Sequence, residues 1–260
     1  MEKEFGKLSR SQLKTFFAYL HDFKEQRKDV ADLTTSKQSS FKAILADAPT
    51  WSSWYELPYP TFQVLLLDAF GMLDDIIRIS QEDDPHQAII EYVESDEDEE
   101  VEGEFEYSDE EKGLLFSLMF ANMGHIDALS MYGTDMNALV QGATNDDEQL
   151  FNAVLVDRTA VACPTIAQRI ELASLQGDEG FMNKLAKAIT RTRPRRPVEK
   201  LDDMRYMLCV LGEAKPLSEI PMKDMYDLLE TDLELYSSKP GGDSYEAMKK
   251  LIRRMRRSRT

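Results

Sequence analysis

The fold class is decided by residues 108–133, which read SDEEKGLLFSLMFANMGHIDALSMYG. Ser108 and Glu111 have the spacing of a capping box, in which two side chains bond each other's backbone N–H groups at a helix start. Gly133 suits the helix end because glycine adopts the left-handed conformation without strain. Residues 113–126 contain no Asp, Glu, Lys or Arg. Since a bilayer span needs about 20 apolar residues, this stretch predicts a buried core helix and no membrane span.

Helical patterns continue on both sides of this stretch. Residues 62–77, FQVLLLDAFGMLDDII, place apolar side chains at i, i+3, i+4 and i+7 and predict one continuous helix of four turns. Capping signals predict further helix ends: Ser9 with Gln12 and Pro85 or Pro164 at starts, and Gly177 at a stop.

Two places in the sequence leave alternatives open. Thr144 or Asn145 is expected to cap a helix whose first turn carries the acids of residues 146–148. Residues 153–163 are rich in Val and Ala and fit either a helix or a strand. The helical signals on both sides favour helix there.

The pattern as a whole predicts an all-α protein, a multi-helix bundle. We expect a smaller N-terminal helical part over residues 1–93 and a larger C-terminal helical part over residues 108–260, joined by an acidic segment at residues 94–107. Within the larger part, residues 191–198 form a basic connector, and residues 244–259 form a basic tail helix.

Charge is distributed unevenly along the chain. The net charge is −17, and residues 51–150 alone carry 25 acidic side chains against two basic ones. Both ends are mildly basic, with 9 basic and 7 acidic side chains in residues 1–50, and 20 and 16 in residues 151–260. This balance argues against a protein that coats nucleic acid or anionic lipid with its whole surface.

The acids concentrate in residues 94–111, ESDEDEEVEGEFEYSDEE, with 12 carboxylates among 18 residues. Mutual repulsion favours a solvated linker. A calcium loop of the EF-hand type is not indicated, because Gly103 lacks the alternating ligands around it. An alternative to the linker is that the run mimics a polyanion and docks on a basic surface, with Phe105 and Tyr107 as anchors.

No linear motif for catalysis, cofactor binding or metal binding is present, so we predict no catalytic residue, no cofactor and no metal site. Cys163 before Pro164 has the position of a helix-start thiolate, but no general base is in view, and a buried structural thiol is the simpler interpretation. Asp74 and Asp75 are read as paired surface acids. Two cysteines and no apolar leader after Met1 lead us to expect a cytoplasmic protein.

Residues 49–60, PTWSSWYELPYP, hold both tryptophans of the chain. Trp51, Trp54, Tyr55 and Tyr59 provide rigid contact area, so they are candidate partner-binding residues. The alternative is that they pack as a connector between helices. The segment thus predicts either a docking patch or a piece of core.

Basic residues gather in residues 184–200 and in the tail. Those that we expect to contact a polyanion are Lys184, Lys187, Arg191, Arg193, Arg195, Arg196, Lys249, Lys250, Arg253, Arg254, Arg256 and Arg257. Residues 173–189 loosely resemble a helix-turn-helix, but the acids Asp178 and Glu179 would repel phosphate, which favours a plain antiparallel helix pair.

These observations favour a non-enzymatic regulatory or interaction protein. Its basic C-terminal elements would contact a polyanion, with nucleic acid as the expected case, and its acidic middle would modulate that contact. One alternative is a protein–protein adaptor that docks through residues 49–60 or the tail helix. A second alternative is a helical enzyme without a linear motif.

Overall fold

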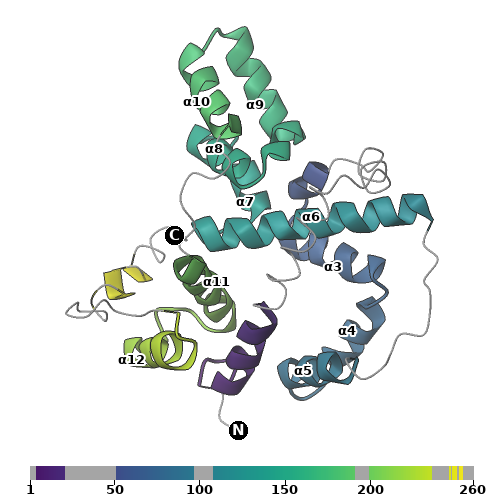
Figure 1. The fold of residues 1–260 in the computed structure, drawn as a ribbon, viewed down its shortest axis with the longest axis vertical. Coiled ribbons are helices and arrows are strands. Elements are labelled where there is room, and N and C mark those ends of the chain that lie inside the picture. Colours follow the sequence, from purple (N-terminus) through teal and green to yellow (C-terminus); the bar gives the residue numbers. More distant parts are fainter. Residues whose placement is uncertain are drawn as a thin grey trace. The chain divides into compact units, whose positions relative to one another are not determined.

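The computed structural model describes residues 4–20, 51–96, 108–190, 199–235, 246, 248–250 and 252–253. Over these ranges the secondary structure is helical and contains no strand, which confirms the predicted all-α class (Figure 1). The chain forms two compact units. Unit 1 comprises residues 1–42, 74–106 and 199–260, and unit 2 comprises residues 43–73 and 107–198.

Each unit combines chain from both sides of the acidic run. This grouping differs from the division in chain order that we predict at residues 94–107, most of which lie outside the described residues.

Unit 2 is built around α6, the long helix in Figure 1. The elements of this unit in the described ranges are η1 (Trp51–Glu56), α3 (Tyr59–Ala69), α6 (Asp109–Tyr132), α7 (Met136–Gly142), α8 (Asp147–Val156), η2 (Arg158–Ala162), α9 (Pro164–Leu175) and α10 (Glu179–Thr190). Helices η1, α3, α7 and α8 all contact α6. Their shared core includes Phe62, Leu118 and Leu150, each buried.

Both ends of α6 form as the sequence predicts. The backbone N–H of Ser108 donates to Glu111 Oε2 at 2.8 Å, and the N–H of Glu111 donates to Ser108 Oγ at 3.3 Å. Gly133 ends the helix with φ 74°. By length and composition, Glu111–Tyr132 could cross a membrane, with a mean hydropathy of 1.2 in its most apolar window. In unit 2 this helix supplies buried residues to the core instead.

The prediction of one helix over residues 62–77 is wrong. Helix α3 stops at Ala69, and α4 (Leu73–Ile79) begins after a turn at Gly71, which has φ 70°. The N–H of Met72 donates to the Leu67 carbonyl at 2.8 Å, and the N–H of Gly71 donates to that of Asp68 at 2.9 Å. These are the two bonds of a Schellman motif. Apolar spacing continues across the break, which hides it in the sequence.

Residues 135–163 also differ in part from expectation. Helix α7, capped by Asp135, was not anticipated, and α8 is capped by Asp146 rather than by Thr144 or Asn145. The strand alternative for residues 153–163 is wrong, because α8 runs to Val156 and the 3₁₀ turn η2 follows. Asp157 separates the two helical pieces with extended backbone and caps η2 through the Thr159 N–H.

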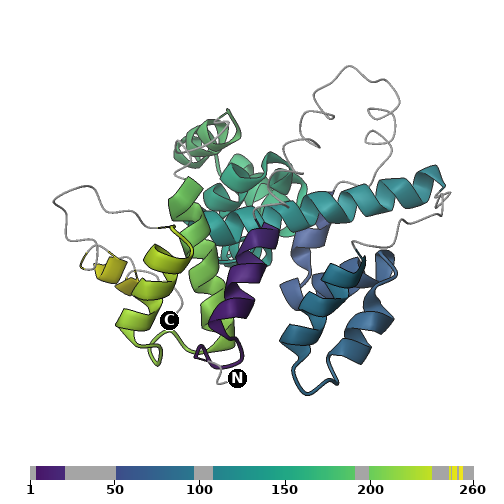
Figure 2. The same ribbon diagram turned by 60° about the horizontal axis from the view of Figure 1, so that its bottom comes forward.

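Unit 1 joins the N-terminal helix to helices from later in the chain. Its elements in the described ranges are a helix over residues 10–20, α4, α5 (Pro85–Asp96), α11 (Glu199–Ala214), α12 (Met222–Tyr226) and the π-helical turn η3 (Asp227–Asp232). Figure 2 shows the helix of residues 10–20 beside α11, and the rings of Phe16 and Tyr206 stack with centroids 6.3 Å apart.

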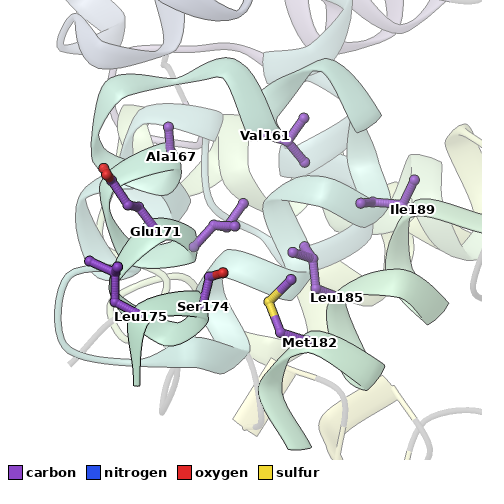
Figure 3. Close-up of a pocket in the computed structure, with 9 residues that line it drawn as sticks. Val161, Ala167, Glu171, Ser174, Leu175, Met182, Leu185 and Ile189 are labelled. Atoms are coloured by element: carbon purple, nitrogen blue, oxygen red, sulfur yellow. The ribbon is translucent and has the colours of Figure 1, made fainter. Parts of the chain in front are cut away.

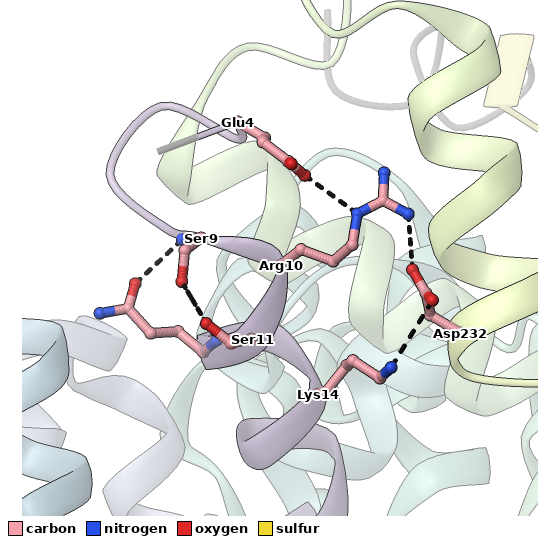
Figure 4. A network of polar contacts seen from close by, with 7 residues as sticks. Glu4, Ser9, Arg10, Ser11, Lys14 and Asp232 are labelled. Carbon is pink, nitrogen blue, oxygen red and sulfur yellow. Dashed lines mark hydrogen bonds and ion pairs between the residues drawn. The ribbon is translucent and has the colours of Figure 1, made fainter. Parts of the chain in front are cut away.

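An ionic network ties the first helix of unit 1 to η3 (Figure 4). Arg10 donates to Glu4 Oε2 at 2.9 Å and to Asp232 Oδ2 at 2.6 Å, while the Lys14 ammonium lies 3.6 Å from Asp232 Oδ1. The predicted capping box is present here too: the N–H of Ser9 donates to Gln12 Oε1 at 2.9 Å.

Candidate functional site

Two aromatic residues of the predicted docking segment are anchored by the half-buried carboxylate of Asp157. Trp51 Nε1 donates to Asp157 Oδ2 at 2.6 Å, and the Tyr55 hydroxyl donates to the same oxygen at 2.7 Å. Trp54 Nε1 donates to Ser117 Oγ on α6 at 2.8 Å. Burial and Asp157 together raise the pKa of Tyr55 well above its usual value. These bonds hold η1 against α6 and η2.

Tyr55 is fully buried, so its ring has no surface for a partner. Trp51, Trp54 and Tyr59 are partly buried and pack against the core of unit 2. The segment therefore has the contacts of a packed connector, the alternative that the sequence left open.

A buried histidine lies among the same aromatic rings. The His125 ring stacks on Tyr59 and Phe62 with centroids 4.4 and 5.0 Å apart, and Tyr55 approaches it edge-on at 5.5 Å. Its Nδ1 accepts the Met136 N–H at 3.3 Å. Burial lowers its pKa from 6.5 to about 3, so the ring is neutral at physiological pH. Neutral, enclosed and hydrogen-bonded to backbone, His125 is a core residue.

Cys163 is an unreactive thiol in this fold. It is buried, and its Sγ–H donates to the Ser52 carbonyl at 3.0 Å. Burial, with a further contribution from the carboxylates of Glu56 and Asp157, raises its pKa to about 12. Because the thiolate is the nucleophilic form, this geometry offers no nucleophile at neutral pH.

Among the basic residues predicted to contact a polyanion, those that the structure describes are mostly exposed. Lys184 and Lys187 lie on α10, and Lys250 and Arg253 lie in the tail, all exposed to solvent. Lys249 pairs with Glu246 at 3.0 Å. In the tail, Met248 and Ile252 are fully buried, so its apolar stripe is in use within the protein. The remaining predicted contacts, Arg191, Arg193, Arg195, Arg196, Arg254, Arg256 and Arg257, lie outside the described residues.

A surface groove between α9 and α10 was not anticipated from the sequence. Figure 3 shows its lining side chains, and its volume is about 480 Å³. The lining residues are Val161, Ala167, Ile170, Glu171, Ser174, Leu175, Met182, Leu185 and Ile189. The sequence contains one signal of this groove, since Leu175 lies outside the apolar stripe of Ile166, Ile170 and Ala173. The structure leaves the Leu175 side chain 80% exposed.

Over the described ranges, no group of three or more His, Cys, Asp or Glu side chains could hold a metal ion. Comparison with known proteins finds no matching family model, no similar curated protein and no similar solved structure. A function for this chain is therefore inferred from its own residues.

Proposed function

We propose that this chain is a non-enzymatic interaction protein that binds a polyanion, with nucleic acid as the expected ligand. The contact would be made by α10 and the arginines that follow it, with the basic tail as a second element. The acidic residues 94–107 would modulate the contact by competing for the same cations.

The proposal depends on the solvent exposure of Lys184 and Lys187 and on their lack of described ion pairs. They lie almost one turn apart on α10, both are exposed, and neither forms an ion pair with a described residue. Phe181, Leu185 and Ala188 are buried and anchor this helix, and the Lys184 ammonium lies 5.9 Å from the ring centroid of Phe151. An anchored helix whose ammonium groups form no ion pair with a described residue is able to contact phosphates without first breaking internal salt bridges.

The structure also bears on the two alternatives. The adaptor hypothesis places partner contacts on residues 49–60 or on the tail helix. Of their described apolar side chains, Tyr55, Met248 and Ile252 are buried. Trp51, Trp54 and Tyr59 pack against the core and stay partly exposed. The enzyme hypothesis receives no support from Cys163, because its raised pKa keeps it in the thiol form. His125 gives no support either, because it is enclosed in the core.

The test measures binding of the full chain to a labelled short duplex DNA, single-stranded DNA and single-stranded RNA by fluorescence anisotropy. Salt is varied between about 50 and 200 mM. We expect affinity to fall with salt, and the Lys184→Gln/Lys187→Gln variant to bind more weakly. Its plot of log K against log [salt] should lose about two units of slope if both lysines contact phosphate.

The matched control is Lys112→Gln/Lys223→Gln, which removes two positive charges elsewhere. It should leave the affinity and the salt slope close to those of the unmodified chain. A third variant, with the acids of residues 97–106 changed to Gln and Asn, should bind more tightly. Absence of binding at the lowest salt, or an equal loss in both double variants, would refute the proposal.

A further inference from the structure

The two helices that form the α9–α10 groove are linked by contacts of Arg169. Arg169 on α9 bonds both carboxylate oxygens of Asp147 on α8, at 2.8 and 2.9 Å. Its guanidinium lies 4.5 Å from the ring centroid of Phe181 on α10. Arg169 thereby links α9 to α8 and α10 within unit 2.

The groove is apolar and open to solvent. Of its lining residues, Leu185 is buried and Ile170 is half-buried, while Leu175 is 80% exposed and Met182 is 37% exposed. Exposed apolar side chains around a concave apolar surface are typical of a protein-binding site. Two antiparallel helices leave a channel between them that suits a third helix laid along it, the helix-in-groove mode of recognition.

The charges at the groove are negative. Glu171 lines it and is exposed, and Glu179 lies three residues before Met182 on the same side of α10. Neither carboxylate pairs with a cation among the described residues. The helical repeat directs Lys184 and Lys187 to the other side of α10, away from the row formed by Met182, Leu185 and Ile189.

We propose that the α9–α10 groove binds an amphipathic helix of a partner protein whose polar face is basic. The partner's apolar stripe would cover Leu175, Met182 and Ile170, and a Lys or Arg beside the stripe would pair with Glu171. This site is separate from the basic side of α10 in the proposed function, so either proposal can fail while the other stands.

The test selects binders for the full chain from a displayed library of helical peptides about five turns long. Apolar residues are fixed at helical spacing, and the other positions vary among Lys, Glu and Gln. We expect selected peptides to carry Lys in excess over Glu. A synthetic copy of one selected peptide should lose at least tenfold in affinity for Leu175→Asp and for Met182→Asp.

Two further variants make the result specific. Leu172→Asp changes a residue of α9 that is 48% exposed but does not line the groove, so it should leave peptide affinity unchanged. Glu171→Lys should reverse the preference, so that Glu-bearing peptides are selected. Circular dichroism checks that each variant keeps its helical content.

Three results would overturn this proposal. One is equal selection of peptides by the unmodified chain and by Leu175→Asp. Another is a peptide preference that Glu171→Lys does not change. The third is self-association of the chain that Leu175→Asp abolishes, measured by sedimentation, because the occupant would then be a second copy.

Discussion

At the residue scale, His125 shows how burial alone sets a charge state. Enclosed by Tyr55, Tyr59 and Phe62, it has a pKa of about 3 in the folded chain, against 6.5 for a free side chain. At pH values between these two pKa values, His125 is therefore protonated in the unfolded chain and neutral in the folded chain. Folding stability from this group is fully present above pH 6.5 and is lost as pH falls toward 3.

We therefore expect the free energy of unfolding of unit 2 to fall by up to about 1.4 kcal/mol per pH unit below pH 6.5 because of His125. Urea unfolding at several pH values measures this, with the fluorescence of Trp51 and Trp54 as the reporter of unit 2. In His125→Phe the decline should be shallower over the same window. An identical decline would show that His125 is not the source.

Gly124 on α6 gives a second prediction at this scale. A Cβ at this position would clash with the Tyr55 hydroxyl oxygen, which Asp157 holds in place. Replacing a helical glycine by alanine ordinarily stabilises a helix by about 1 kcal/mol. Here the clash should outweigh that gain, and we expect Gly124→Ala to lower the free energy of unfolding by about 1–2 kcal/mol.

Gly180 provides the matched control for this prediction. It lies in α10, and a Cβ there would meet no atom closer than 3.4 Å. Gly180→Ala should therefore be neutral or stabilising in the same urea titration. If Gly124→Ala proved as stable as Gly180→Ala, the close approach of Tyr55 to α6 would be wrong.

At the scale of elements, the turn between α3 and α4 depends on one residue. Gly71 has φ 70°, and no atom lies within 4 Å of a Cβ built on it, so backbone conformation alone decides the effect of a substitution. Gly71→Ala should destabilise the protein by about 1–2 kcal/mol, and Gly71→Asn by less, because Asn tolerates the left-handed region. Thermal unfolding followed by circular dichroism measures the Tm of each protein, which should fall in the order Gly, Asn, Ala at position 71. A higher Tm for the alanine variant than for the asparagine variant would contradict this prediction.

The helix ends show which elements are predictable. Ser108 with Glu111, Ser9 with Gln12, and Gly133 act within one turn of the chain, and each forms the predicted cap or stop. The missed break at Gly71 is also local, but the apolar spacing masks it. The shift from Asn145 to Asp146 arises because neighbouring polar residues all suit a cap.

At the scale of the whole molecule, the acidic middle of the chain does not fall within a single unit. The acidic residues 51–150 are divided, since residues 74–106 belong to unit 1 and the rest belong to unit 2. Charge along the chain therefore says little about charge on a unit. For this reason the polyanion proposal depends on individual cations such as Lys184 and Lys187 rather than on the totals.

The amino-acid sequence alone determined the helical class of the described residues and the ends of helices such as α6 and α9, because caps, glycine stops and apolar periodicity act between residues a few positions apart. Tertiary structure alone decided that Tyr55 is buried, because its partner Asp157 lies 102 residues further along the chain. It also decided that Leu175 is exposed at a groove. Both outcomes depend on which helices pack together, and helical spacing carries no information about that pairing.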